Sequence, residues 1–231
     1  MKKKVLAAGA VAGSALVLSG CGIDALAGAQ QTVVSYEVPD KVLVLSMDVE
    51  AGDVVVSESG RSGIKVTETL RWSDDKPETE HRVEGGTLTL EYRCPTGFGL
   101  VHCSVDYKVE VPKGVRVKVQ SGAGDVTLRS LTGGVEAGTG AGDIDASGLA
   151  GKEFVADSGA GDVEAGFAAA PERVEVETGA GDATVRLPQG AYRVTAESGA
   201  GDETVKVQDD PSAPRTVRVS TGAGDAKVLP G

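Results

Sequence analysis

The sequence predicts an all-β protein of the β-solenoid type, in which coils of about 20 residues stack on one another. Three observations carry this prediction. The segment Ser/Thr-Gly-Ala-Gly-Asp occurs six times, and successive aspartates are 18, 19, 20, 20 and 23 residues apart. Apolar residues recur in fixed columns on both sides of each copy. Glycine makes up 33 of 231 residues and aromatic residues only 3%, which suits a thin core of small side chains.

The N-terminus, residues 1–20, predicts a lipoprotein signal peptide. Lys2, Lys3 and Lys4 precede a short apolar run, and Leu18-Ser19-Gly20-Cys21 resembles a bacterial lipobox, in which cleavage occurs before a lipid-carrying cysteine. The apolar run is shorter than the ~20 residues that a membrane span needs. We expect diacylglycerol and palmitate on Cys21, with residues 21–31 as a flexible tether. This predicts an exported protein that is lipid-anchored to the outer face of the cell membrane.

Residues 32–231 are expected to form a single β-repeat domain, with an irregular part over 32–115 and regular repeats over 116–231. A degenerate repeat spans 45–56, where Val49 replaces Ser/Thr and Glu50 replaces the first glycine. Further strands are expected at 64–67, 87–90 and 105–111.

Cys94 and Cys103 flank a turn-rich segment of the irregular part. In an exported protein, a disulfide between them is the favoured interpretation. A metal site of Cys94, His102 and Cys103 is the alternative, but it has no fourth ligand at a familiar spacing.

The regular part alternates apolar and polar residues around each turn, as half-buried strands do. Counted from the aspartate, the apolar columns lie eight and six positions before it and one and three positions after it. Glu203 is the one polar residue in these four columns. Each unit therefore reads as strand, four-residue turn, strand. An antiparallel β-sandwich of hairpins is the alternative fold, because four-residue hairpin loops are common.

The repeated turns consist of two glycines and an aspartate in each copy. We expect each glycine to supply a backbone angle that other residues avoid, and each carboxylate to accept backbone N–H bonds within its own turn. The Ser/Thr hydroxyls are expected to bond turn carbonyls and amides. The predicted structural turn residues are Gly122, Gly124, Asp125, Gly140, Gly142, Asp143, Gly159, Gly161, Asp162, Gly179, Gly181, Asp182, Gly199, Gly201, Asp202, Gly222, Gly224 and Asp225.

An ion ladder is the second interpretation of these turns. Carboxylates about 5 Å apart repel by roughly 1 kcal/mol at the dielectric constant of water, and Ca²⁺ would relieve this repulsion with oxygen ligands. A second acid follows the turn aspartate in only two coils, so the candidate calcium ligands are Asp143 with Asp145 and Asp162 with Glu164. No other cofactor is expected.

Composition and motifs argue against several functions. The formal charge of −11, with no basic stripe, excludes nucleic acid as an expected partner. The sequence completes no dinucleotide-binding, P-loop or nucleophile-elbow motif, and its two histidines, His81 and His102, are expected at the surface. No catalytic residue is predicted. A polysaccharide-active enzyme remains a remote alternative, because paired carboxylates can come from any two coils.

The repeated Ser/Thr-Gly-x-Gly-Asp-Val turns after a lipobox are similar to those of the bacterial "putative adhesin" family of extracytoplasmic β-strand-repeat lipoproteins, a domain family of unknown function. The likeness covers residues 32–231. It implies a β-solenoid-like fold and supplies no functional residues. The sequence therefore predicts a non-catalytic, adhesin-like or scaffolding surface protein with a protein or glycan partner, or else a calcium-binding β-repeat protein. Length variation lies opposite the constant turn, so that edge is expected to carry the binding loops.

Overall fold

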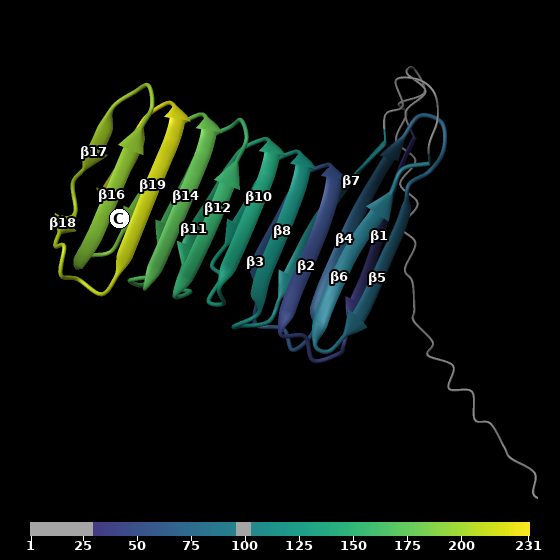
Figure 1. Cartoon of the computed structure of the whole chain (residues 1–231). Helices are drawn as coiled ribbons and strands as arrows, with labels where there is room; N and C mark the ends of the chain where they lie inside the picture. The colour runs from purple at the N-terminus through teal and green to yellow at the C-terminus, as the bar shows by residue number, and fades with distance from the viewer. Residues whose placement is uncertain (1–29, 96–102) are drawn as a thin grey trace, which may run out of the picture.

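The computed structural model describes residues 30–95 and 103–231, which form two ten-stranded sheets that face each other (Figure 1). The first sheet has the order β1 (Gln30–Val38), β4 (Ile64–Trp72), β7 (Cys103–Val111), β3 (Val54–Glu58), β9 (Val126–Arg129), β11 (Ile144–Leu149), β13 (Val163–Phe167), β15 (Ala183–Leu187), β20 (Ala226–Pro230) and β17 (Glu203–Val205). The second has the order β18 (Gln208–Asp209), β16 (Ala191–Ser198), β19 (Thr216–Ala223), β14 (Arg173–Ala180), β12 (Glu153–Ser158), β10 (Val135–Ala141), β8 (Arg116–Ala123), β2 (Val44–Ala51), β6 (Thr87–Arg93) and β5 (Glu78–Glu84).

Each repeat places one strand in each sheet, and the Gly-Ala-Gly-Asp turn joins the two. Neighbouring repeats pair in parallel and in register, so that Val117 lies beside Val135 and Val135 beside Phe154. This parallel pairing confirms the solenoid-like fold over the alternative of stacked hairpins. Antiparallel pairing occurs only at β1–β4, β4–β7 and β5–β6 among the described strands.

The core is the narrow layer between the two sheets, filled by the predicted apolar columns. All members of these columns are buried except Val194, Ala196, Glu203 and Val205. These four residues belong to β16 and β17, the last full coil of the stack in space. Their exposure therefore follows from position, because no further coil covers them.

The coils do not stack in chain order. The coil of β2 and β3 lies between the coils β6–β7 and β8–β9, and the coil of β19 and β20 lies between β14–β15 and β16–β17. The last coil of the chain is thus buried on both sides, whereas the coil before it stands at the end. This order suits the sequence, because β19 and β20 keep Val217, Val219 and Val228 in the core while β17 carries Glu203.

The irregular part confirms the expected strands, which lie within β4, β6 and β7, and the expected disulfide, whose sulfurs are 2.05 Å apart. One boundary and one strand differ from prediction. Gln30 and Gln31, assigned to the tether, already belong to β1 and pair with Trp72 and Arg71. Strand β5 was not predicted, because its sequence Glu-Thr-Glu-His-Arg-Val-Glu has one apolar residue.

The signal peptide, Cys21, most of the tether and His102 lie outside the described residues. Within the described ranges, no helix is long and apolar enough to cross a membrane.

Candidate functional site

The two edges of the stack carry different chemistry, and the turn edge is the more regular. The arrowheads of β8, β10, β12, β14 and β19 in Figure 1 point toward it. Here the turn aspartates form a ladder. The backbone N–H of each aspartate donates to the Oδ1 of the aspartate in the neighbouring coil, at 2.7 to 3.2 Å. In space the ladder runs Asp106, Asp53, Asp125, Asp143, Asp162, Asp182, Asp225, Asp202.

This ladder corrects the expectation that each carboxylate bonds within its own turn. The acceptor and the donor belong to different coils, so the aspartates join coils to one another. A hydrogen bond to a charged acceptor contributes about 1.5–3 kcal/mol when it is well shielded and less at an exposed edge such as this one.

The two glycines of each turn are required for different reasons. The second glycine has a positive φ, from +129° at Gly52 to +152° at Gly201. The first glycine does not, which corrects the prediction that both supply an unusual angle. At Gly140 a Cβ would instead lie 2.5 Å from the carbonyl oxygen of Gly122 in the neighbouring coil. The first glycine is therefore required by close backbone approach between coils.

The Ser/Thr column forms a second, buried ladder. Thr139, Ser158, Thr178, Ser198 and Thr221 each donate a hydroxyl hydrogen bond, at 2.8 to 3.1 Å, to a glycine carbonyl of the neighbouring coil. The predicted bond to a turn carbonyl is confirmed, although it links two coils. Ser121 is the exception, because its buried hydroxyl has no partner.

The four candidate calcium ligands do not converge on one point. Asp145 forms a bidentate pair with Arg129 at 2.7 Å, and Glu164 pairs with Arg186 at 3.0 Å. Asp143 and Asp162 accept ladder bonds. No group of three or more His, Cys, Asp or Glu side chains suited to a metal occurs in residues 30–95 and 103–231. Calcium binding stays a prediction, which the thermal midpoint with and without EDTA would test.

Local charge pairs set the protonation of two ladder carboxyls. The Lys227 ammonium lies 2.9 Å from Asp182 and 2.8 Å from Asp225. This hydrogen bonding, followed by the ladder amides, lowers the pKa of both carboxyls. Both aspartates therefore stay ionised in moderately acidic solution.

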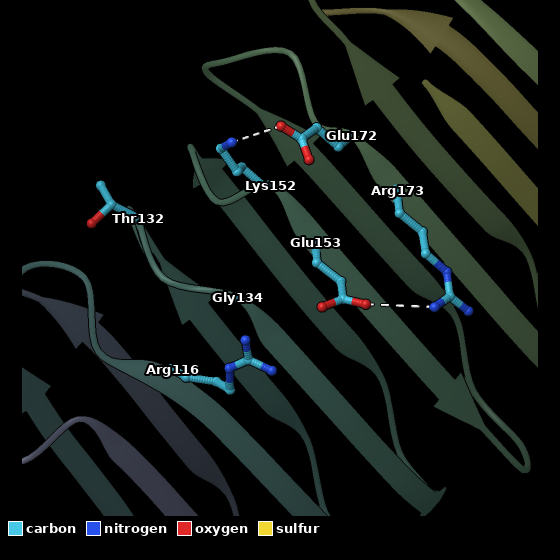
Figure 2. A pocket seen from close by; sticks show the side chains of 7 residues that line it. All are labelled: Arg116, Thr132, Gly134, Lys152, Glu153, Glu172 and Arg173. Atoms are coloured by element: carbon cyan, nitrogen blue, oxygen red, sulfur yellow. Dashed lines mark hydrogen bonds and ion pairs between the residues drawn. The ribbon is translucent and has the colours of Figure 1, made fainter. Parts of the chain in front are cut away.

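The opposite, loop edge carries a groove on the outer face of the second sheet, a hollow of about 450 Å³ (Figure 2). We call it the loop-edge groove. It is lined by Arg116, Thr132, Gly134, Lys152, Glu153, Glu172 and Arg173. These residues come from the starts of β8, β12 and β14 and from the loops before β10, β12 and β14.

Stacking in register builds this groove. The residue before the first core residue of each coil points outward, and in successive coils this position holds Arg116, Gly134, Glu153 and Arg173. Gly134 leaves a gap in the row, since a Cβ there would find its nearest atom, the Nε of Arg116, only at 3.8 Å. Because Gly134 has no side chain, the space between Arg116 and Glu153 stays open.

The charges of the loop-edge groove are unevenly paired. Lys152 pairs with Glu172 at 2.7 Å, which raises the pKa of the lysine, and Arg173 lies 3.5 Å from Glu153. Arg116 makes no ion pair within the described residues, and Figure 2 shows its guanidinium and that of Arg173 on different sides of Glu153. Exposed pairs contribute only about 0–1 kcal/mol, so a ligand can displace them at little cost.

The sequence predicted binding loops at this edge, among them 166–172, which contains Glu172, but it did not predict the groove or the row from Arg116 to Arg173. The signal was present, because the column nine positions before each aspartate contains Arg116, Gly134, Glu153 and Arg173. His81, expected at the surface, is exposed and stacks on Tyr36 with ring centroids 4.4 Å apart. On the loop edge, the Glu58 carboxylate accepts both the Thr132 hydroxyl at 2.5 Å and the Thr132 backbone N–H at 2.9 Å.

Fold and edges together define a solenoid-like repeat protein with a hydrogen-bonded turn edge and a grooved loop edge. The sequence matches the family Toastrack DUF4097 over residues 43–200 and 96–229, and the chain belongs to that family.

A solved structure with a TM-score above 0.5 shares the fold, and a second one is less similar. A "putative cell adhesion protein" from Clostridium sporogenes is 17% identical, with a TM-score of 0.54, over 87% of this chain and 100% of its own. A "putative adhesin" from Bacteroides fragilis is 15% identical, with a TM-score of 0.49, over 86% and 97% of the two chains. No curated protein matches.

Proposed function

We propose that this chain is a non-catalytic, lipid-anchored surface protein that binds a partner through its loop edge. The observation that carries the proposal is the contrast between the edges. Turn-edge carboxylates and hydroxyls are used in joining coils, whereas the loop edge offers a groove with an unpaired cation. The adhesion-related names of proteins with a similar fold support the same direction.

The anchor follows from the sequence. The Lys-rich start, the apolar run and the Leu-Ser-Gly-Cys segment ending at Cys21 support export and lipidation. Removing residues 1–20 takes away three lysines and no acid, which leaves 20 basic and 34 acidic residues. An acidic body is repelled by an anionic membrane surface, so a lipid on a flexible tether would hold the domain off the bilayer.

The anchor is tested with Cys21→Ala in the full chain. The parent protein should sediment with membranes and incorporate labelled palmitate, and the variant should do neither. Membrane association of Cys21→Ala without lipid would contradict the anchor and leave the binding role to be tested separately.

The binding role is tested with cells that display the lipidated chain. Adhesion to envelope glycans or host-surface extracts should exceed that of cells displaying Gly134→Val, a variant designed to fill the groove. Equal adhesion of the two strains would contradict binding at the loop edge.

A further inference from the structure

We propose that the loop-edge groove is a subsite for a carboxylate-bearing polysaccharide, such as a uronate polymer, and that Arg116 holds a carboxylate. This inference rests on the proposed binding role and adds the ligand class and the residue that selects it.

Arg116 is placed to receive an anion. It is exposed at the start of β8, has no ion pair within the described residues, and faces the open position left by Gly134. In contrast, Arg173 on β14, Arg186 on β15 and Arg218 on β19 all pair with glutamates. A guanidinium offers planar paired donors that match a carboxylate. An anion in this gap would satisfy the free cation.

The overall charge makes the groove distinctive. The chain carries a formal charge of −11, but the groove has the three cations Arg116, Lys152 and Arg173 against Glu153 and Glu172. Anions are repelled from most of this surface and meet local attraction here. Electrostatic complementarity of this kind sets specificity and association rate more than raw affinity.

The two glutamates favour a glycan over an acidic peptide. An acidic peptide would place negative charge against Glu153 and Glu172 and offers only one backbone N–H donor per residue between its carboxylates. A uronate polymer carries hydroxyl groups between its carboxylates, and these can donate to Glu153, Glu172 and Thr132. Sugar hydroxyls and carboxylates thus match the alternating acceptors and cations of the groove.

The shape suits a linear polymer. Arg116 and Arg173 lie three strands apart in the order β8, β10, β12, β14, and at the usual strand spacing this is about 14 Å. The groove is partly open to solvent, and no aromatic side chain lines it. We therefore expect weak binding per site, driven by charge-assisted hydrogen bonds and lowered by salt.

The test measures binding of an oligogalacturonate to the mature lipidated chain in detergent, at low and at physiological ionic strength. Arg116→Gln should weaken binding about tenfold, the scale of one charge-assisted hydrogen bond. Gly134→Val should weaken it similarly without changing charge. A Cβ at residue 134 meets nothing closer than 3.8 Å, so this variant is expected to fold.

Arg218→Gln is the matched control, because it removes the same charge from the outer face of the second sheet outside the groove. It should bind like the parent protein. Equal losses in Arg116→Gln and Arg218→Gln would overturn the proposal in favour of diffuse charge. A neutral oligosaccharide that binds equally well, or DNA or dextran sulfate that binds more tightly, would overturn the ligand class.

The two proposals can fail separately. If oligogalacturonate does not bind but displayed cells still adhere better than their Gly134→Val counterparts, the ligand class is wrong and the binding role stands. If adhesion is lost only with the anchor and never with groove variants, the groove itself is excluded.

Discussion

The two ends of the stack are closed by different physical means. At the N-terminal end, β1, β4 and β5 form antiparallel pairs, and the core is covered by large side chains that include Tyr36 of β1, Trp72 of β4 and Tyr107 of β7. The buried carboxylate of Glu68, only 2% exposed, accepts a 2.7 Å hydrogen bond from Tyr36, and burial raises the pKa of that tyrosine. This end is sealed by covering it.

At the C-terminal end, β16 and β17 keep half-buried or exposed residues in the core columns, and β18 covers only the start of β16. Two carboxylates occupy the free edge. Asp209 accepts the backbone N–H of Val194 at 3.0 Å, and Glu203 accepts that of Ser198 at 3.1 Å. Donors that would pair with another strand are thereby used. The same type of repeat can thus be closed either by antiparallel strands that cover the core or by carboxylates that accept the N–H bonds of the edge strand.

The degenerate turn near Asp53 shows how position in the stack shapes sequence. Val49 stands in the Ser/Thr column and Glu50 in the column of the first glycine, beside β6. Tyr92 of β6 contacts this turn, and its hydroxyl lies 2.6 Å from both the N and the O of Ala51. Departures from the repeat therefore mark where regular stacking stops.

The largest effect is expected where regular coils touch. Gly142→Ala should destabilise by about 3 kcal/mol or more, because φ is +144° and the new Cβ would lie 2.2 Å from the carbonyl of Gly124. The control is Gly85→Ala in the β5–β6 turn, where φ is +57° and nothing lies within 4 Å. It should cost about 1 kcal/mol. Equal costs in urea unfolding would contradict the close-packed turn edge.

Replacing Cys94 and Cys103 with alanine should cost roughly 2–3 kcal/mol, the entropy of a short closed loop. The loss should concentrate at the N-terminal end, since the disulfide joins the end of β6 to the start of β7. Hydrogen exchange should rise in β4 to β7 and not in β12 to β15. Equally faster hydrogen exchange in all strands would mean that the N-terminal end and the middle of the stack unfold together.

Glu203→Val should make the free edge at β16 and β17 associate with another copy of the chain. It removes the acceptor of the Ser198 N–H and restores an apolar residue to the core column. Self-association should strengthen about tenfold, equivalent to one hydrogen bond at the edge. Sedimentation over a range of concentrations measures this change, with Glu197→Val on the outer face as control. A monomer at every concentration would show that the carboxylate does not protect the edge.

The next smaller effect compares two positions of the Ser/Thr column: Thr178 in the regular middle of the stack, and Ser121 in the first regular coil. Thr178→Val should cost about 1 kcal/mol, because it removes the 2.8 Å bond to the carbonyl of Gly161. Ser121→Ala should be nearly neutral, since that buried hydroxyl has no partner. Similar midpoints for these two variants in urea would contradict a stabilising role for the ladder.

Sequence periodicity predicted the columns, the strands and the turns, because each depends on neighbours along one coil. It missed the links between coils, such as the Asp125 carboxylate accepting the N–H of Asp143. The order of coils was also missed, although Glu203 in an apolar column indicates an end coil. The groove residue Arg116 was missed because its environment depends on Gly134, 18 residues later. Such relations appear only when the stacking partners are known.

The smallest expected effect is a shift in the pH of acid unfolding. It arises where the β19–β20 coil packs against the β14–β15 coil. Lys227 lowers the pKa of Asp182 and Asp225, first through its hydrogen bonds to the two carboxylates. A carboxyl whose pKa is lower in the folded state stabilises the fold above its unfolded pKa, about 3.9 for aspartate, and this stabilisation is lost as pH falls through the folded pKa. Lys227→Met should therefore lower stability near neutral pH and move the acid unfolding midpoint to higher pH.

Lys118→Met is the matched control, since Lys118 pairs at 2.7 Å with Glu136 on the outer face of the second sheet, away from the aspartate ladder. Its acid midpoint should stay closer to that of the parent protein, because it relieves one exposed pair rather than a lysine shared by two carboxylates. If the acid midpoints of both variants shift equally, Lys227 does not stabilise the β19–β20 coil more than an ordinary exposed ion pair would. A shift confined to Lys227→Met would mean that the junction between the middle and the C-terminal end is held partly by charge, unlike the covered N-terminal end.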